Sequence, residues 1–138
     1  MDIKQCVCLA DFRILAQKAM PKDVFEYLDS GSNEEQTLRE NESSFHKLMI
    51  IPRVLKSISL PDMSLQIFGK TLQLPFGFAP TAMQMISHPQ GEILSSQICQ
   101  EKGLIMCLSI LSNKSLGEVV QVNPSGMKLL QLYISKDW

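Results

Sequence analysis

Apolar positions recur with a helical period over the first third of the chain. Segment 12–19 places its apolar residues on one face, and Asp11 stands where it could cap a helix. A second helix is predicted to start at Pro21, whose missing N–H costs nothing there, and to stop at Ser30-Gly31. A third, mostly polar helix is predicted over residues 34–47. This part of the chain is therefore expected to be helical.

The period shortens to two between residues 64 and 74. Two short alternating arms flank Phe68-Gly69-Lys70, a pattern that predicts a β-hairpin with glycine in its turn. The arms are short and mostly polar on one face, so we expect the hairpin at an end or edge of the main body.

Beyond residue 75, apolar strands alternate with helices. The Ser115–Glu118 segment matches a capping box, and Gly103 follows a helical pattern that it would close. This alternation predicts βαβ units with a parallel sheet and hence an α/β fold. The predicted strands cover residues 76–79, 104–109 and 129–134, and the predicted helices cover residues 92–102 and 115–122.

A boundary is predicted near Leu74-Pro75. Residues 1–74 would form a helical segment with the hairpin, and residues 75–138 would form the first β/α units. Three parallel strands are too few for a closed (β/α)₈ barrel, which takes about 250 residues. They would form an open sheet with an uncovered edge.

Composition narrows the function classes. The 138 residues carry a net charge of −1 and show no polybasic face, so neither nucleic acid nor a membrane surface is expected as a partner. No stretch reaches the length of a bilayer span, and the first residues lack the apolar core of a secretion signal. The four cysteines, two at 6 and 8 and two in apolar surroundings, are expected to be reduced thiols. His46 and His88 have no companions at ligand spacing, so no metal site is predicted.

Candidate chemistry lies where the predicted strands end, because ligands of parallel β/α folds meet those ends. The ends carry Pro80-Thr81-Ala82, Ser109, Gln131 and Tyr133. Gln131 interrupts an apolar strand and shares a side with Tyr133, so a planar heterocycle with amide-like edges could pair with it. Its amide could equally be satisfied by neighbouring backbone, and the threonine could be a turn cap. The other residues of that strand, Leu130, Leu132 and Ile134, are expected to face a helix layer.

A series of short motifs, in order along the chain, resembles the amino-terminal part of the FMN-dependent α-hydroxy acid oxidases. The glycolate oxidases look most similar, through Met83-Gln84 and Leu132-Tyr133-Ile134. The motifs that carry the resemblance are Tyr27 to Gly31, Thr37 to Asn41, Phe45, Pro52 to Leu55, Pro75, Ala79 to Gln84, His88-Pro89, Gly91-Glu92, Leu108-Ser109, Gln131 to Ile134, and Lys136-Asp137.

The resemblance implies a (β/α)₈ barrel preceded by helices and a hairpin, with FMN as cofactor. It implies oxidation of a glycolate-like 2-hydroxy acid to the 2-oxo acid, with O₂ reduced to H₂O₂. The residues that would contact FMN are Pro80, Thr81, Ala82, Ser109 and Gln131. Tyr27 and Tyr133 would face the substrate, as phenols that stay protonated and donate to its carboxylate. A homotetramer and a peroxisomal location are also implied, although no targeting signal is visible.

Two features set the chain apart from the family pattern. Leu111 stands where the oxidases commonly have a tryptophan bordering the substrate, which could enlarge the pocket. The family's catalytic histidine and its substrate-binding arginine match no residue of this chain, so we expect the chain alone to be inactive. One alternative is a truncated, non-catalytic product that binds a full-length partner. Another, a small domain for a different nucleotide, lacks a Gly-rich phosphate loop.

Overall fold

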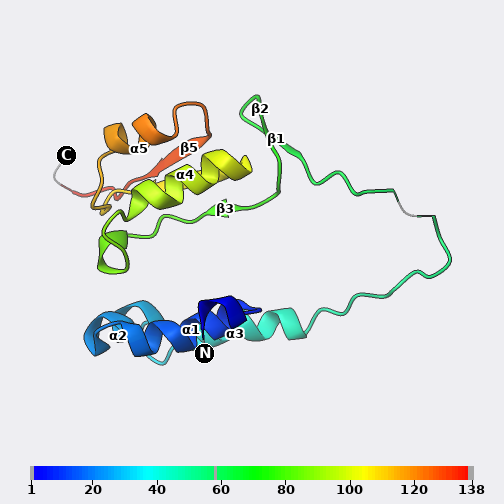
Figure 1. Cartoon of the computed structure of the whole chain (residues 1–138), viewed down its shortest axis with the longest axis horizontal. Coiled ribbons are helices and arrows are strands. Elements are labelled where there is room, and N and C mark those ends of the chain that lie inside the picture. The colour runs from blue at the N-terminus through cyan, green and yellow to red at the C-terminus, as the bar shows by residue number, and fades with distance from the viewer. Residues whose placement is uncertain (1, 58, 137–138) are drawn as a thin grey trace. The chain divides into compact units, whose positions relative to one another are not determined.

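The computed structural model describes residues 2–57 and 59–136, which fall into two compact units (Figure 1). The first unit is Met1–Ile58 and the second is Ser59–Trp138. Each unit is described by itself below. None of the helices in the described residues combines the length and apolar character needed to cross a bilayer.

The first unit is helical, as its sequence period predicts. Arg13 Nε and Nη2 donate to the two carboxylate oxygens of Asp29 at 2.5 and 2.7 Å, which ties the first long helix to the second. This pairing lowers the pKa of Asp29. The helices are the 3₁₀ turn η1 (Ile3–Gln5), α1 (Leu9–Ala19), α2 (Lys22–Asp29) and α3 (Gln36–His46).

The start of α1 differs from the expectation that Asp11 would be its cap. The helix starts three residues earlier than residue 12, and Asp11 lies inside its first turn. Its Oδ2 accepts hydrogen bonds from the N–H groups of Val7 and Cys8, at 2.9 and 3.2 Å. An acidic residue can satisfy the free N–H groups at a helix start from the third position as well as from the cap, and these two bonds fix the earlier start.

The predicted hairpin is confirmed. Strands β1 (Leu65–Ile67) and β2 (Lys70–Leu72) pair antiparallel through a turn at Phe68 and Gly69, where φ is 46° and 73°. Two positive φ values characterise the turn that suits a two-residue hairpin. Leu72 is buried, and the Gln73 N–H donates to the Gly103 carbonyl at 3.2 Å.

These contacts place the hairpin in the second compact unit. The division between compact units consequently falls at residues 58 and 59, whereas the sequence pattern suggested a boundary near Leu74-Pro75. A change of period marks where secondary structure changes, but a compact unit is defined by which elements pack together.

The second unit contains the predicted parallel sheet. Strand β4 (Ile105–Ser109) is central, flanked by β3 (Gly77–Phe78) and β5 (Lys128–Gln131). Helices α4 (Glu92–Lys102) and α5 (Leu116–Val122) connect the strands, after the short 3₁₀ turn η2 (Gln84–Ile86). In Figure 1, α4 runs along the sheet and α5 lies beside it.

Side chains from β4 and the two helices form the core. Because alternate residues of a strand point to opposite faces, Met106 and Leu108 face the helices. The opposite face of the sheet carries Cys107 and Ser109, with Leu129 and Gln131 beside them in register. The core cluster consists of Cys99, Leu104, Met106, Leu108 and Val119.

The end of β5 departs from the expected strand 129–134. The observed strand stops at Gln131, and Leu132 and Ile134 beyond it are 50% and 92% exposed rather than packed in a helix layer. Leu130, which pairs with the buried Leu108, is also 45% exposed. A strand forms only where it has a neighbour to pair with, and in the described residues β5 pairs on one side only.

Candidate functional site

The carboxyl ends of β4 and β5 bring two predicted site residues together. Ser109 and Gln131 are register partners on neighbouring strands. The Ser109 hydroxyl donates to Gln131 Oε1 at 3.4 Å, and Ser109 is 4% exposed. The Ile110 N–H donates to the same oxygen at 3.4 Å. The carboxyl end of the sheet thus holds a polar pair on the face opposite the core.

The amide of Gln131 is only partly satisfied by these bonds. Its oxygen accepts hydrogen bonds from two neighbouring groups, as expected for a strand glutamine that is satisfied by its neighbours. In the described part of the chain, Gln131 Nε2 donates to no hydrogen-bond acceptor. The side chain is half-buried, so its amide donors remain available to a carbonyl oxygen of a planar ligand.

The loop after β3 carries the other predicted group, Pro80-Thr81-Ala82. Pro80 and Thr81 are exposed and Ala82 is half-buried. The Thr81 N–H donates to the Ala79 carbonyl at 2.8 Å, and Gln84 Nε2 donates to the Thr81 carbonyl at 3.3 Å. The backbone of this loop is therefore held in place, and the hydroxyl of the exposed Thr81 donates to the Ala79 carbonyl at 3.5 Å, as a turn cap would.

Backbone hydrogen bonds join this loop to the loop after β4. The Met83 N–H donates to the Leu111 carbonyl at 3.2 Å, and the Met85 N–H donates to Asn113 Oδ1 at 3.0 Å. The structure therefore brings the segment after Pro80 and the segment after Ser109 to one end of the sheet. The sequence pattern did not identify Asn113 as a contributor, because a polar loop residue carries no periodic signal.

Glu92 is a second residue of this region for which the sequence indicated no role in the site, although it belongs to a motif of the family resemblance and to the start of a predicted helix. It is the first residue of α4 and is fully buried. Its Oε1 accepts hydrogen bonds from the N–H groups of Gln84 and Asn113, at 3.2 and 3.0 Å. A glutamate at this position ordinarily indicates a helix start, so only the fold reveals that it spans two loops.

The two predicted substrate tyrosines are exposed. Tyr133 follows the end of β5 and is 64% exposed. Tyr27 lies on α2, in the first compact unit, and is 58% exposed. The expected substrate-facing role of both tyrosines stays a prediction.

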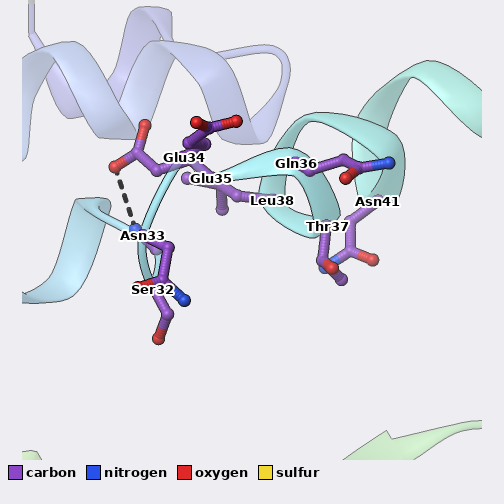
Figure 2. A pocket seen from close by; sticks show the side chains of 9 residues that line it. Ser32, Asn33, Glu34, Glu35, Gln36, Thr37, Leu38 and Asn41 are labelled. Atoms are coloured by element: carbon purple, nitrogen blue, oxygen red, sulfur yellow. Dashed lines mark hydrogen bonds between the residues drawn. The ribbon is translucent and has the colours of Figure 1, made fainter.

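A hollow of about 710 Å³ lies elsewhere, in the first unit. The turn between α2 and α3 forms it, and Figure 2 shows the polar side chains around that turn. The Gly31 N–H donates to Glu35 Oε1 at 3.1 Å, so part of its polar surface serves the turn itself. The carboxylates of Glu34 and Glu35 would repel an anionic ligand, so the lining of this hollow does not favour a phosphate or a carboxylate.

Two titratable groups with pKa values shifted by burial lie away from the sheet end that carries Ser109. Burial lowers the pKa of Lys128, whose ammonium donates to the carbonyls of Asn123 and Gly126 at the opposite end of β5. Burial raises the pKa of Cys99 in the core. Within the described residues, no three His, Cys, Asp or Glu side chains gather as a metal site would require.

Comparison with known proteins gives a consistent result. The profile of the FMN-dependent dehydrogenase family matches residues 16–138. Human 2-hydroxyacid oxidase 1 is 33% identical over 135 residues, which are 98% of this chain and 36% of the relative. Glycolate oxidase 1 of Oryza sativa subsp. indica is 35% identical over 127 residues, which are 92% of this chain and 34% of the relative.

Solved structures agree with the sequence relatives. A lactate oxidase of Pediococcus acidilactici superposes with a TM-score of 0.90 at 33% identity, covering 100% of this chain and 38% of that one. A mandelate oxidase superposes with a TM-score of 0.86 at 32% identity, covering 96% of this chain and 39% of that one. These neighbours are TIM-barrel oxidases, so the described β/α units correspond to part of a barrel. The chain spans about a third of the length of the curated relatives it matches.

Proposed function

The chain belongs to the family of FMN-dependent dehydrogenases, and from that membership we propose that it provides one wall of the FMN site in an oxidase of small 2-hydroxy acids. FMN is the cofactor of this family. The structural observation that carries the proposal is the Ser109–Gln131 pair at the carboxyl ends of β4 and β5. In parallel β/α folds this is the end of the sheet at which ligands bind.

The residues at this end suit a flavin. Gln131 Nε2 offers donors to a ring carbonyl, and Ser109 holds the amide oxygen in place. The loop with Pro80, Thr81 and Ala82 would supply further contacts through its backbone. A ring system that is planar, mostly apolar and polar along one edge fits a half-buried sheet end with a few fixed polar groups.

The protein's share of the reaction would be binding and orientation. Bound FMN would supply the redox chemistry, in which two electrons leave the substrate and are passed on to O₂. The phenols of Tyr27 and Tyr133 would donate to the substrate carboxylate. We do not assign a catalytic acid or base within this chain. Acid–base catalysis needs a titrating group in reach of the substrate, and His88, in the connection between β3 and α4, matches no catalytic residue of the family.

The substrate class rests on the family and on one position. Leu111, in the loop after β4, is 54% exposed. In this place a leucine leaves more room than a tryptophan, so the pocket would accept side chains larger than that of glycolate. Relatives named for glycolate, lactate and mandelate span that range of sizes.

Two preparations test the proposal. In the first, the purified chain is titrated with FMN, and quenching of flavin fluorescence is expected at micromolar concentrations; the chain alone is expected to produce no H₂O₂ from glycolate, lactate or mandelate. In the second, residues 1–138 replace the matching part of the rice glycolate oxidase. This chimera is expected to retain FMN and to produce H₂O₂, with a relative preference for the larger substrates. A chimera that folds without FMN would contradict the proposal.

A second candidate function is non-catalytic binding to a full-length relative. It is favoured by the side of β5 that pairs with no strand among the described residues, and by the exposed apolar residues Leu132 and Ile134 that follow β5. Unpaired strand edges attract other strands. Size-exclusion chromatography of the chain mixed with a full-length oxidase tests this candidate, and separate elution at micromolar concentrations would rule it out. The homotetramer and the peroxisomal location implied by the family remain predictions.

A further inference from the structure

Glu92 connects the two loops that carry the proposed FMN contacts. Its side chain is fully buried at the first position of α4. Oε1 accepts from the Gln84 N–H in the loop after β3 and from the Asn113 N–H in the loop after β4. One carboxylate oxygen therefore holds two segments that are adjacent in space but far apart in the sequence.

The surrounding contacts close this connection into a network. The Met85 N–H donates to Asn113 Oδ1, so Asn113 contacts the first loop directly through its side chain and is joined to it through Glu92 by its backbone N–H. Ser95, one turn along α4, donates from its hydroxyl to Gln84 Oε1 at 2.6 Å. Gln84 Nε2 then reaches the carbonyl of Thr81, one of the proposed FMN contacts.

Gly91 permits the close approach on which this network depends. Its φ is 47°, and a Cβ at this position would lie 2.9 Å from Met85 Cγ and 3.1 Å from Met85 N. The first loop therefore folds directly over the start of α4. There the partial positive charge of the helix end favours a carboxylate.

We propose that Glu92 is a positioning residue that sets the spacing between the two FMN-facing loops, 80–85 and 109–113. Loops beyond the ends of strands have no ladder of hydrogen bonds to hold them in register, so a buried acceptor shared by both loops takes over that role. The inference deepens the proposed function and rests on it for the identity of the ligand. Glu92 acts on FMN only through the loops.

The second carboxylate oxygen of Glu92 guides the choice of substitutions. Glu92 Oε2 is buried and has no hydrogen-bond partner in the described residues. Substitution by glutamine keeps an oxygen for both N–H groups and removes the charge, whereas substitution by leucine removes the acceptor altogether. Comparison of the two variants therefore separates the hydrogen bonds from the volume of the side chain.

Amide hydrogen exchange, followed by NMR on the 138-residue chain, tests the inference. In Glu92→Leu, the amides of Gln84 and Asn113 are expected to exchange about tenfold faster, because both lose their hydrogen-bond acceptor. Glu92→Gln is expected to restore most of the protection. Glu101→Leu, at an exposed position on the same helix, serves as the matched control and is expected to leave both amides unchanged.

Asn113→Ala is a second variant, which tests the same network if Glu92→Leu does not fold. Asn113 is exposed, and its alanine variant loses only the acceptor of the Met85 N–H. The Met85 amide is expected to exchange about tenfold faster, while the Gln84 amide, still bonded to Glu92, stays protected. Unchanged exchange at Gln84 and Asn113 in a folded Glu92→Leu protein, or unchanged exchange at Met85 in Asn113→Ala, would overturn the loop coupling.

An FMN titration of the same variants supplies a readout that a merely structural role would not move. Glu92→Leu is expected to weaken FMN binding by about tenfold, with rescue by Glu92→Gln and no effect of Glu101→Leu. Faster exchange with unchanged FMN affinity would overturn the positioning role. Failure of the unaltered chain to bind FMN would instead count against the proposed function, and the exchange data would still decide the loop coupling.

Discussion

At the scale of single residues, the polar groups near the ends of β4 and β5 differ in how visible they are in the sequence. Ser109 and Gln131 stand out because they interrupt or end apolar runs, and the structure pairs them. Glu92 and Asn113 show no such contrast with their neighbours, yet they join the two loops of the candidate site. A residue that acts through long-range contacts is visible only once the chain is folded.

Gln131→Leu tests how much the Ser109–Gln131 pair contributes to stability and to FMN binding. The variant leaves the buried hydroxyl of Ser109 without its acceptor, so the second unit is expected to lose about 1–3 kcal/mol of stability and FMN affinity is expected to fall. Urea unfolding and flavin fluorescence measure the two effects. Gln90→Leu, at an exposed loop position, is the control. Equal behaviour of the two variants would show that the pair has no such role.

At the scale of elements, helix starts were predictable where the whole signal lies within one turn. The capping box at Ser115 and Glu118 is present as predicted, with hydrogen bonds of 2.9 and 3.2 Å. Asp11 was assigned to the wrong position because an acidic residue serves equally well at the cap or inside the first turn. The strand after residue 128 ended early because strand length depends on the neighbouring strand.

Ser115→Ala is expected to destabilise α5 by about 1 kcal/mol, because the variant loses the acceptor of the Glu118 N–H. Urea unfolding followed by circular dichroism measures the change. Ser57→Ala, at an exposed position outside the helices and strands, is the control. A loss no larger than that of the control would mean that the cap contributes nothing.

The same capping box predicts a pH dependence for α5. Hydrogen bonds from Ser115 lower the pKa of Glu118, so its contribution is present above the unfolded pKa of about 4.3 and is lost as pH falls through the lower folded pKa. Exchange of the Ser115 amide is therefore expected to accelerate in acid below pH 4, beyond the intrinsic rate. In Glu118→Gln this acceleration should disappear.

At the scale of the whole molecule, the apolar residues divide sharply between buried and exposed. The described core of the second unit is small, and Met106 at its centre is 1% exposed. Apolar residues between the third helix and the hairpin, Met49 among them, are largely exposed. Composition alone cannot distinguish these two groups, because both consist of the same residue types.

Met106→Ala is expected to cost about 2–5 kcal/mol, since it removes buried contacts and leaves a cavity between β4 and the helices. Met49→Ala is the matched control, because Met49 is 90% exposed and should change stability by less than about 0.5 kcal/mol. Denaturant unfolding of both variants provides the measurement. Similar losses in the two would contradict the packing of Met106 in the core.

The sequence by itself determined the order and type of the elements, the hairpin turn, the parallel β/α pattern and the family. These features depend on local periodicity, on turn chemistry and on motifs that lie within a few residues of one another. The tertiary structure alone decided where β5 ends, that the hairpin packs with the β/α units, and that Glu92 and Asn113 join two loops. Those features depend on contacts between segments far apart in the chain, and a linear pattern carries no record of which distant groups will satisfy one another's hydrogen bonds.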